Sequence, residues 1–131
     1  MVIKFSRITI IRNKQPPKEL NAEIQWLGQS LGLFNERDKE KSCFRIFIEI
    51  MKSNKGNISS EELAHRSNLT RATAIHHLHR LMESGLVSCA NNRYFLRHQE
   101  LNKIIDELKS DLEETLIHMK KIAKNIDKEL K

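Results

Sequence analysis

The chain has 131 residues, the length of one ordinary domain, and carries a formal net charge of +6. This charge favours an acidic partner such as nucleic acid, although an anionic membrane surface would attract it as well. Two cysteines cannot build a disulfide framework, and no apolar run approaches the roughly 20 residues that span a bilayer. With no signal-peptide pattern at the start, these features predict a soluble, cytoplasmic protein without membrane association.

The positive charge is concentrated in the middle of the chain. Residues 39–98 carry ten Lys and Arg against five Asp and Glu, whereas residues 99–131 carry seven against eight. Five of the six histidines, from His65 to His98, lie in the same middle segment. A contact with nucleic acid is therefore expected there.

Residues 1–18 form a basic arm with the composition of a strand, although without clean alternation, and Pro16-Pro17 ends it. Apolar residues then recur at spacings of four, three and four and predict a helix over residues 19–33. They are Leu20, Ile24, Leu27 and Leu31. A second helix is expected from a cap at Asn35 to about Ser53. Its apolar side holds Phe44, Phe47, Ile48 and Met51.

A short helix, Ser60–Ser67, is expected after a turn at residues 55–57. Ser59 and Glu62 have the three-residue spacing of a capping box, in which a hydroxyl accepts a hydrogen bond from a backbone N–H of the first turn. Residues 68–69 break this helix.

A longer helix, Arg71–Ser84, follows, with Thr70 as its cap and Gly85 where helices usually end in a left-handed residue. Two short strands are expected next, Leu86–Ala90 and Arg93–Leu96. The Asn91-Asn92 pair between them is suited to a two-residue hairpin turn.

The last segment, residues 99–131, has no Gly or Pro and predicts one helix about 50 Å long at ~1.5 Å per residue. Its apolar residues follow a 3.5-residue repeat with only Thr115 out of character. A domain with about 60 core residues cannot cover such a helix, so a second copy is the economical partner, parallel or antiparallel. Together with the stripe of the first helix, the predicted dimer interface is Leu20, Ile24, Leu27, Leu31, Leu101, Ile105, Leu108, Leu112, Met119, Ile122 and Ile126.

A short helix, a tight break, a second helix, a glycine and a hairpin follow one another in the order of a winged helix-turn-helix. The predicted fold is therefore mainly α, with a short two-stranded β-hairpin wing and a long C-terminal dimerisation helix. We expect three parts: a basic arm (1–18), a winged helix-turn-helix domain with its leading helix (19–98) and the dimerisation helix (99–131).

The stretch SEELAHRSNLTRATAIHHLHRLMESGLV resembles the helix-turn-helix of ArsR/MarR-type winged-helix transcriptional regulators. In that family the second helix commonly reads Ser-His-His-Leu or Ser-Arg-His-Leu ahead of Gly-Leu-Val. The resemblance covers residues 40–97 and implies a bacterial or archaeal DNA-binding regulator. The leading helix and the long last helix are also similar to ArsR-type dimers, whose flanking helices pack across the two-fold axis. Archaeal winged-helix proteins with a C-terminal coiled coil are equally similar.

Three histidines stand within four positions at His76-His77-Leu78-His79, and histidine is both a common metal ligand and a frequent general base. At 100° per residue, His77 falls on the core face with Ala74, whereas His76 and His79 fall on the opposite face. No third ligand stands near that outward pair. The Cys-x-Cys that ArsR-type metal sensors usually carry before the recognition helix is absent. We therefore expect no metal, no cofactor, no catalytic residue and no enzyme activity.

A recognition helix in the major groove explains the outward face better. Arg71 can reach a phosphate or a guanine, and Thr70 at the helix N-terminus favours a phosphate. Candidates for base contact are Thr73, Ile75 and His76. Candidates for contact with the DNA backbone are His79, Arg80, Ser59, Ser60, Arg66 and, on the wing beside the minor groove, Arg93.

The leading hypothesis is a homodimeric regulator that binds double-stranded DNA sequence-specifically through residues 71–84. Two alternatives stay open: an architectural winged-helix protein with little sequence preference, and a winged-helix protein-interaction module. The sequence identifies no small-molecule effector. Both cysteines are expected to be buried as small apolar residues, Cys43 beside the core stripe and Cys89 opposite Tyr94 in the hairpin.

Overall fold

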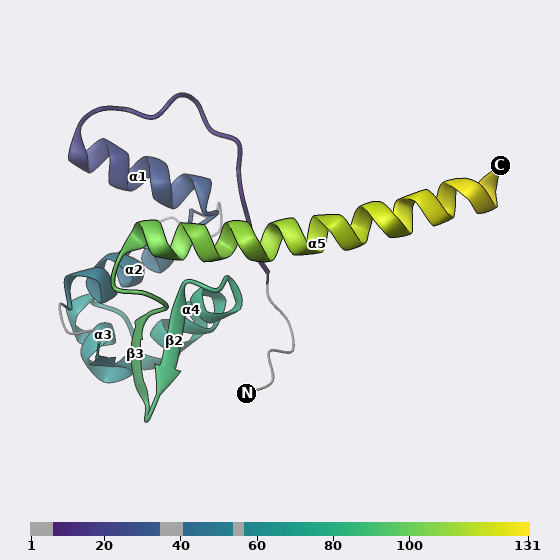
Figure 1. Ribbon diagram of the computed structural model, residues 1–131. Helices are drawn as coiled ribbons and strands as arrows, with labels where there is room; N and C mark the ends of the chain where they lie inside the picture. Colours follow the sequence, from purple (N-terminus) through teal and green to yellow (C-terminus); the bar gives the residue numbers. More distant parts are fainter. Residues whose placement is uncertain (1–6, 35–40, 54–56) are drawn as a thin grey trace. The chain divides into compact units, whose positions relative to one another are not determined.

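The computed structural model describes residues 7–34, 41–53 and 57–131. The chain divides into two compact units, Met1–Arg97 and His98–Lys131. The first unit is a winged helix-turn-helix in which a small antiparallel sheet follows and joins the helices, and the second is one long helix (Figure 1). The predicted fold class is confirmed.

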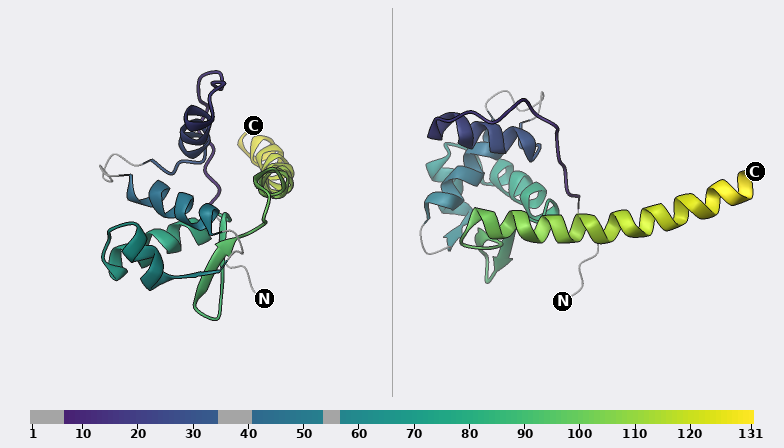
Figure 2. Two further views of the ribbon diagram at one scale, coloured as in Figure 1. Left: turned by 90° about the vertical axis from the view of Figure 1, so that its left-hand side faces the viewer. Right: turned by 45° about the horizontal axis from the view of Figure 1, so that its top comes forward.

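Three helices build the core of the first unit: α2 (Ser42–Lys52), α3 (Ser60–Arg66) and α4 (Arg71–Glu83). The helix α4 packs against both α2 and α3, and all three lie on one side of the hairpin (Figures 1 and 2). The side chains from these elements that are almost completely buried are Cys43, Ile46, Phe47, Ile50, Leu63, Ala74, Leu78 and Leu81.

The helix α2 differs from its prediction in its start and in its buried face. It begins at Ser42, because Lys41 has a left-handed φ of 56° that does not continue a helix. The predicted cap, Asn35, lies outside the described residues. The buried stripe is Cys43, Ile46, Phe47 and Ile50. The predicted stripe was thus rotated by about one residue, because apolar residues almost surround this helix and its periodicity permits both choices.

The sheet has the strand order β1-β3-β2, with both pairings antiparallel. The hairpin strands β2 (Val87–Ala90) and β3 (Arg93–Leu96) match the prediction closely, and Asn91 and Asn92 take φ values of 53° and 61°. Positive φ at both central residues is the hallmark of a tight hairpin turn, which asparagine tolerates. The sequence gave no signal for β1 (Ile58–Ser59), a two-residue strand that pairs with β3 and makes it the central strand.

The helix α1 (Leu20–Ser30) lies beside α2, away from the hairpin tip (Figure 2). It ends before the predicted limit at residue 33, because Gly32 takes a left-handed φ of 71°. A Cβ built on Gly28 would lie 2.4 Å from Cε1 of Phe44, so the glycine allows α1 to approach α2 closely.

The strand predicted for the N-terminal arm is absent from residues 7–18, and residues 1–6 are outside the described part. The backbone N–H groups of this segment instead reach helix ends: Arg7 donates to the Glu83 carbonyl at 2.8 Å and Ile11 to the Ser30 carbonyl at 2.8 Å. In return, the indole N–H of Trp26 donates to the Lys14 carbonyl at 2.7 Å. Helix ends have replaced a neighbouring strand as partners.

The second unit is α5 (Leu101–Leu130), a helix of 30 residues that is about 45 Å long at ~1.5 Å per residue. Near its start, His98 Nε2 lies 3.3 Å from Glu107 Oε1. Beyond residue 112 every side chain of the helix is exposed. None of the helices in the described ranges is both long enough and apolar enough to cross a membrane.

Candidate nucleic-acid interface

The helix α4 is fixed at both ends by local signals that its sequence carries. The Thr70 hydroxyl oxygen accepts a hydrogen bond from the Thr73 N–H at 3.1 Å and lies 2.8 Å from the Thr73 hydroxyl. At the other end, Gly85 takes a left-handed φ of 82° and its N–H donates to the Met82 carbonyl. The predicted cap and stop are confirmed, and α4 is a well-defined element with two distinct faces.

The inward face of α4 holds the core of the domain. Its buried members are Ala74, His77, Leu78 and Leu81. His77 is 7% exposed and its ring meets the His76 ring edge to face, with centroids 5.6 Å apart. The prediction that His77 points inward is confirmed.

The outward face of α4 is exposed, as the helical geometry predicted. The exposed members are Arg71, Ala72, His76, His79 and Glu83, and the half-buried margins are Thr73, Ile75 and Arg80. Among the described residues, no three His, Cys, Asp or Glu side chains gather as metal ligands would. The three histidines therefore belong to two faces, one packed in the core and one open to a partner.

The start of α4 is suited to an anion. The first backbone N–H groups of a helix lack intrahelical acceptors and carry the positive end of the helix dipole. The first turn contains no acidic residue, and the Arg71 side chain adds a full positive charge there. A DNA phosphate or a guanine edge is the chemistry that such an end recognises.

The predicted contacts on α3 are placed less openly than those on α4. Ser60 is only 7% exposed, and the Ser59 hydroxyl accepts a hydrogen bond from the Glu62 N–H at 3.1 Å, which confirms Ser59 as the helix cap. Arg66 Nη2 donates to Glu62 Oε1 at 2.7 Å, so part of its charge is compensated within α3. These three side chains are committed first to the helix itself.

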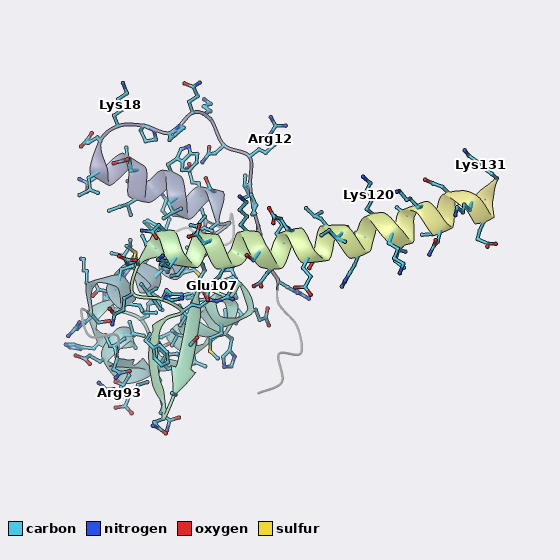
Figure 3. The ribbon with its side chains drawn as sticks, viewed as in Figure 1. Arg12, Lys18, Arg93, Glu107, Lys120 and Lys131 are labelled. Carbon is cyan, nitrogen blue, oxygen red and sulfur yellow. The ribbon has the colours of Figure 1, made fainter. Side chains whose placement is uncertain are left out.

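The wing carries Arg93, which Figure 3 shows beside the hairpin turn. Its guanidinium Nη2 donates to the Asn57 carbonyl at 3.1 Å and ties the hairpin to the start of β1, while the side chain stays exposed. A guanidinium has five N–H donors, so this bond leaves others for a phosphate. Arg93 thus holds the wing in place and remains available to a ligand.

Tyr94 is a residue of this region that the sequence analysis did not assign to the interface. Burial raises the pKa of its phenol, the charge of and a hydrogen bond with Cys89 raise it further, and the positive charge of Arg71 opposes the shift. Tyr94 pairs with Cys89 across the hairpin, as predicted. The influence of Arg71 shows that the start of α4 and the wing share one electrostatic environment, a tertiary relation without a local sequence signal.

The two cysteines differ in exposure. Cys43 is buried, as expected, but Cys89 is exposed, so its predicted burial was wrong. The reason is its position on β2, an edge strand of the sheet whose second half extends past the core. Alternation within a four-residue strand does not distinguish an edge from a central position.

Comparison with known proteins supports the interpretation of this surface. Residues 44–88 match the family model of winged helix-turn-helix DNA-binding domains. The match runs from the first turn of α2 into β2 and therefore includes the whole of α3 and α4. No curated protein and no solved structure matches the chain.

The fold and the family match together support a DNA-binding regulator. The elements that the match contains are those that place α4, with its outward face open, at the surface of the domain. In helix-turn-helix proteins the second helix of the motif enters the major groove, and here that helix is α4.

Proposed function

We propose that the protein is a homodimeric transcriptional regulator of the ArsR/MarR type that binds double-stranded DNA sequence-specifically, with α4 in the major groove. The observation that carries this proposal is the exposed face of α4, which starts with Arg71 and continues through His76 and His79. Base edges in the major groove present donors and acceptors that such side chains can read. The family match over residues 44–88 supports the same assignment.

The side chains of α4 take separate roles in this proposal. Arg71 reads a guanine or binds a phosphate, and Thr73 and His76 contact base edges, while Ile75 lies against a thymine methyl group. His79 and Arg80, further along the helix, lie near the DNA backbone, and Thr70 presents the helix N-terminus to a phosphate. Arg93 on the wing contacts a phosphate or the adjacent minor groove.

The homodimer is supported by the exposed apolar side chains of α5. Met119, Ile122 and Ile126 are 50–59% exposed in the single chain, a large loss for side chains of this kind. Their spacings of three and four residues place them on one side of the helix, as in a coiled-coil seam. A second copy of the same helix is the partner that we propose, with the stripe of α1 as an additional contact.

A two-fold dimer would present two copies of α4 to DNA. For proteins that read the major groove, the two recognition helices lie about one helical turn, or roughly 34 Å, apart. The preferred DNA site is therefore expected to be a palindrome, or close to one, with half-sites centred about 10 base pairs apart.

The proposal is tested by enriching preferred duplexes from a random pool and measuring the affinity of variants for them. Arg71→Ala and His76→Ala are each expected to weaken binding by about tenfold to a hundredfold, the cost of ~1–3 kcal/mol for a lost base contact. Lys18→Ala is the matched control, since it also removes one positive charge but lies at the far end of the domain from Arg93 (Figure 3).

The control is expected to bind within about twofold of the unmodified chain, because one exposed charge away from the interface changes affinity little at physiological salt. Unchanged affinity of both α4 variants would contradict the placement of α4 in the groove. An equal loss in all three variants would show that only total charge matters, as for an architectural protein.

A further inference from the structure

The turn between α3 and α4 sets the direction in which the recognition helix leaves the domain. Ser67 ends α3, and Asn68 follows in the left-handed region with a φ of 55°. The Leu69 N–H then donates back to the Ala64 carbonyl at 2.9 Å, and Thr70 starts α4 in an extended conformation. Four residues thus convert the axis of one helix into that of the next.

A side chain from a different helix enters this turn. Arg45, on the side of α2 next to its buried stripe, donates from Nη2 to the carbonyl oxygen of Ser67. Ser67 is almost completely buried, and a carbonyl at the end of a helix has no intrahelical donor. A guanidinium at that end also matches the negative pole of the α3 dipole, and hydrogen bonds from charged donors are the stronger class.

This contact links the element that carries the core to the element that aims α4. Arg45 precedes Ser67 by 22 residues, so the bond is a tertiary one and not part of the local turn. The remaining hydrogen bonds of the turn are short-range and hold it to α3, such as that from the Asn68 N–H to the His65 carbonyl at 3.2 Å. The bond from α2 therefore ties the turn to the rest of the core.

We propose that Arg45 is a positioning residue for DNA recognition, which acts through Ser67 to fix the angle at which α4 meets the base edges. The proposal rests on the proposed function of α4. Base contacts require donors and acceptors to be placed closely, whereas contacts to phosphates tolerate displacement because they are mainly electrostatic. Loss of Arg45 therefore lowers sequence discrimination more than it lowers general affinity for DNA.

The test compares the full-length chain with Arg45→Met on an enriched duplex and on the same duplex with its sequence scrambled, at one salt concentration. The ratio of the two affinities is expected to fall by about tenfold, the size of one impaired base contact, with less than about threefold loss on scrambled DNA. Lys52→Met is the control, because it removes a positive charge from the same helix at a side chain that is 67% exposed. It is expected to leave the ratio unchanged.

An equal loss on both duplexes would overturn the proposal, since it would mean that Arg45 contacts phosphates or only stabilises the fold. Circular dichroism establishes that each variant is folded. If Arg45→Met does not fold, Arg45→Lys decides the matter, because an ammonium lacks the planar fork of the guanidinium. Its ratio is expected to fall by about threefold, and an unchanged ratio would overturn the proposal equally.

Amide hydrogen exchange separates this proposal from the proposed function. In the DNA-free protein, Arg45→Met is expected to accelerate exchange at Leu69 while leaving the Arg97 amide, bonded to the Leu86 carbonyl at 3.0 Å, unchanged. Equal acceleration at both sites would reject a positioning role. A wild-type chain with no sequence preference would instead refute the proposed function, and the exchange result would then decide by itself whether Arg45 positions the turn.

Discussion

Substituting Gly28 by alanine is expected to destabilise the protein, although the same change inside a helix is ordinarily favourable. Gly28 lies in α1 and is buried. A Cβ at this position would lie 2.4 Å from Cε1 and 2.6 Å from Cδ1 of Phe44, distances well inside van der Waals contact. The Phe44 ring is held on another side by Phe34, whose ring centroid is 4.8 Å away in an edge-to-face arrangement.

The magnitude follows from two opposing terms. Alanine gains about 1 kcal/mol over glycine in helix propensity. An extra carbon forced into a packed contact typically costs about 1–3 kcal/mol, and the 2.4 Å approach requires a real displacement of the ring, so the upper half of that range applies. The net expectation is a loss of about 1–2 kcal/mol. For a domain of this size that corresponds to a fall in Tm of roughly 4–8 °C per kcal/mol.

Urea denaturation of Gly28→Ala, Phe44→Leu and the double variant measures both the loss and its cause. Leucine removes the ring atoms that the new Cβ meets, so Gly28→Ala is expected to cost at least about 1 kcal/mol less in the Phe44→Leu background. If Gly28→Ala raised stability in the unmodified chain by the amount that helix propensity supplies, α1 would not pack on Phe44 as described. Additive effects of the two substitutions would contradict the reasoning in the same way.

Three further predictions concern α4, the hairpin and α5. Thr70→Ala is expected to lower the free energy of unfolding by about 1 kcal/mol in urea denaturation, whereas Thr70→Ser keeps the capping oxygen and loses little; equal losses would reject the cap. Spectrophotometric titration should show Tyr94 ionising above pH 10, because burial raises its pKa. A pKa raised by folding means that the associated stability is present below the unfolded pKa and is lost as pH rises through the folded pKa, so stability should fall above about pH 10, and a Tyr94→Phe variant should lack that component. Ile126→Glu is expected to dissociate the proposed dimer in sedimentation equilibrium, whereas Ile117→Glu, nine residues and thus about 180° away on α5, is expected to leave it intact; dissociation by neither or by both would argue against this seam.

The helices of the winged domain were predictable because their ends carry local chemistry. Thr70, Gly85 and the Asn91-Asn92 pair each dictate a backbone conformation, and each adopts it in the structure. The inward position of His77 followed from the angle per residue alone. Within one regular helix, periodicity is sufficient to separate the core face from the outward face.

Features that depend on contacts between distant segments could not be predicted. The buried face of α2 is selected by the helices that pack on it, and β1 exists only because β3 offers an edge to two residues. The exposure of Cys89 depends on β2 being the edge strand. The bond from Arg45 to Ser67 and the influence of Arg71 on Tyr94 likewise join residues far apart in the chain.

The central claim, that α4 reads DNA sequence, is tested most directly by titrating the unmodified chain against an enriched duplex and random duplexes at two salt concentrations. We expect affinity to fall steeply with salt, with a slope near −0.9 per phosphate contact, and the enriched duplex to bind at least about a thousandfold more tightly than random DNA. A ratio near one would instead identify an architectural DNA-binding protein. Absence of salt-dependent binding would contradict DNA recognition altogether and favour a protein-interaction module.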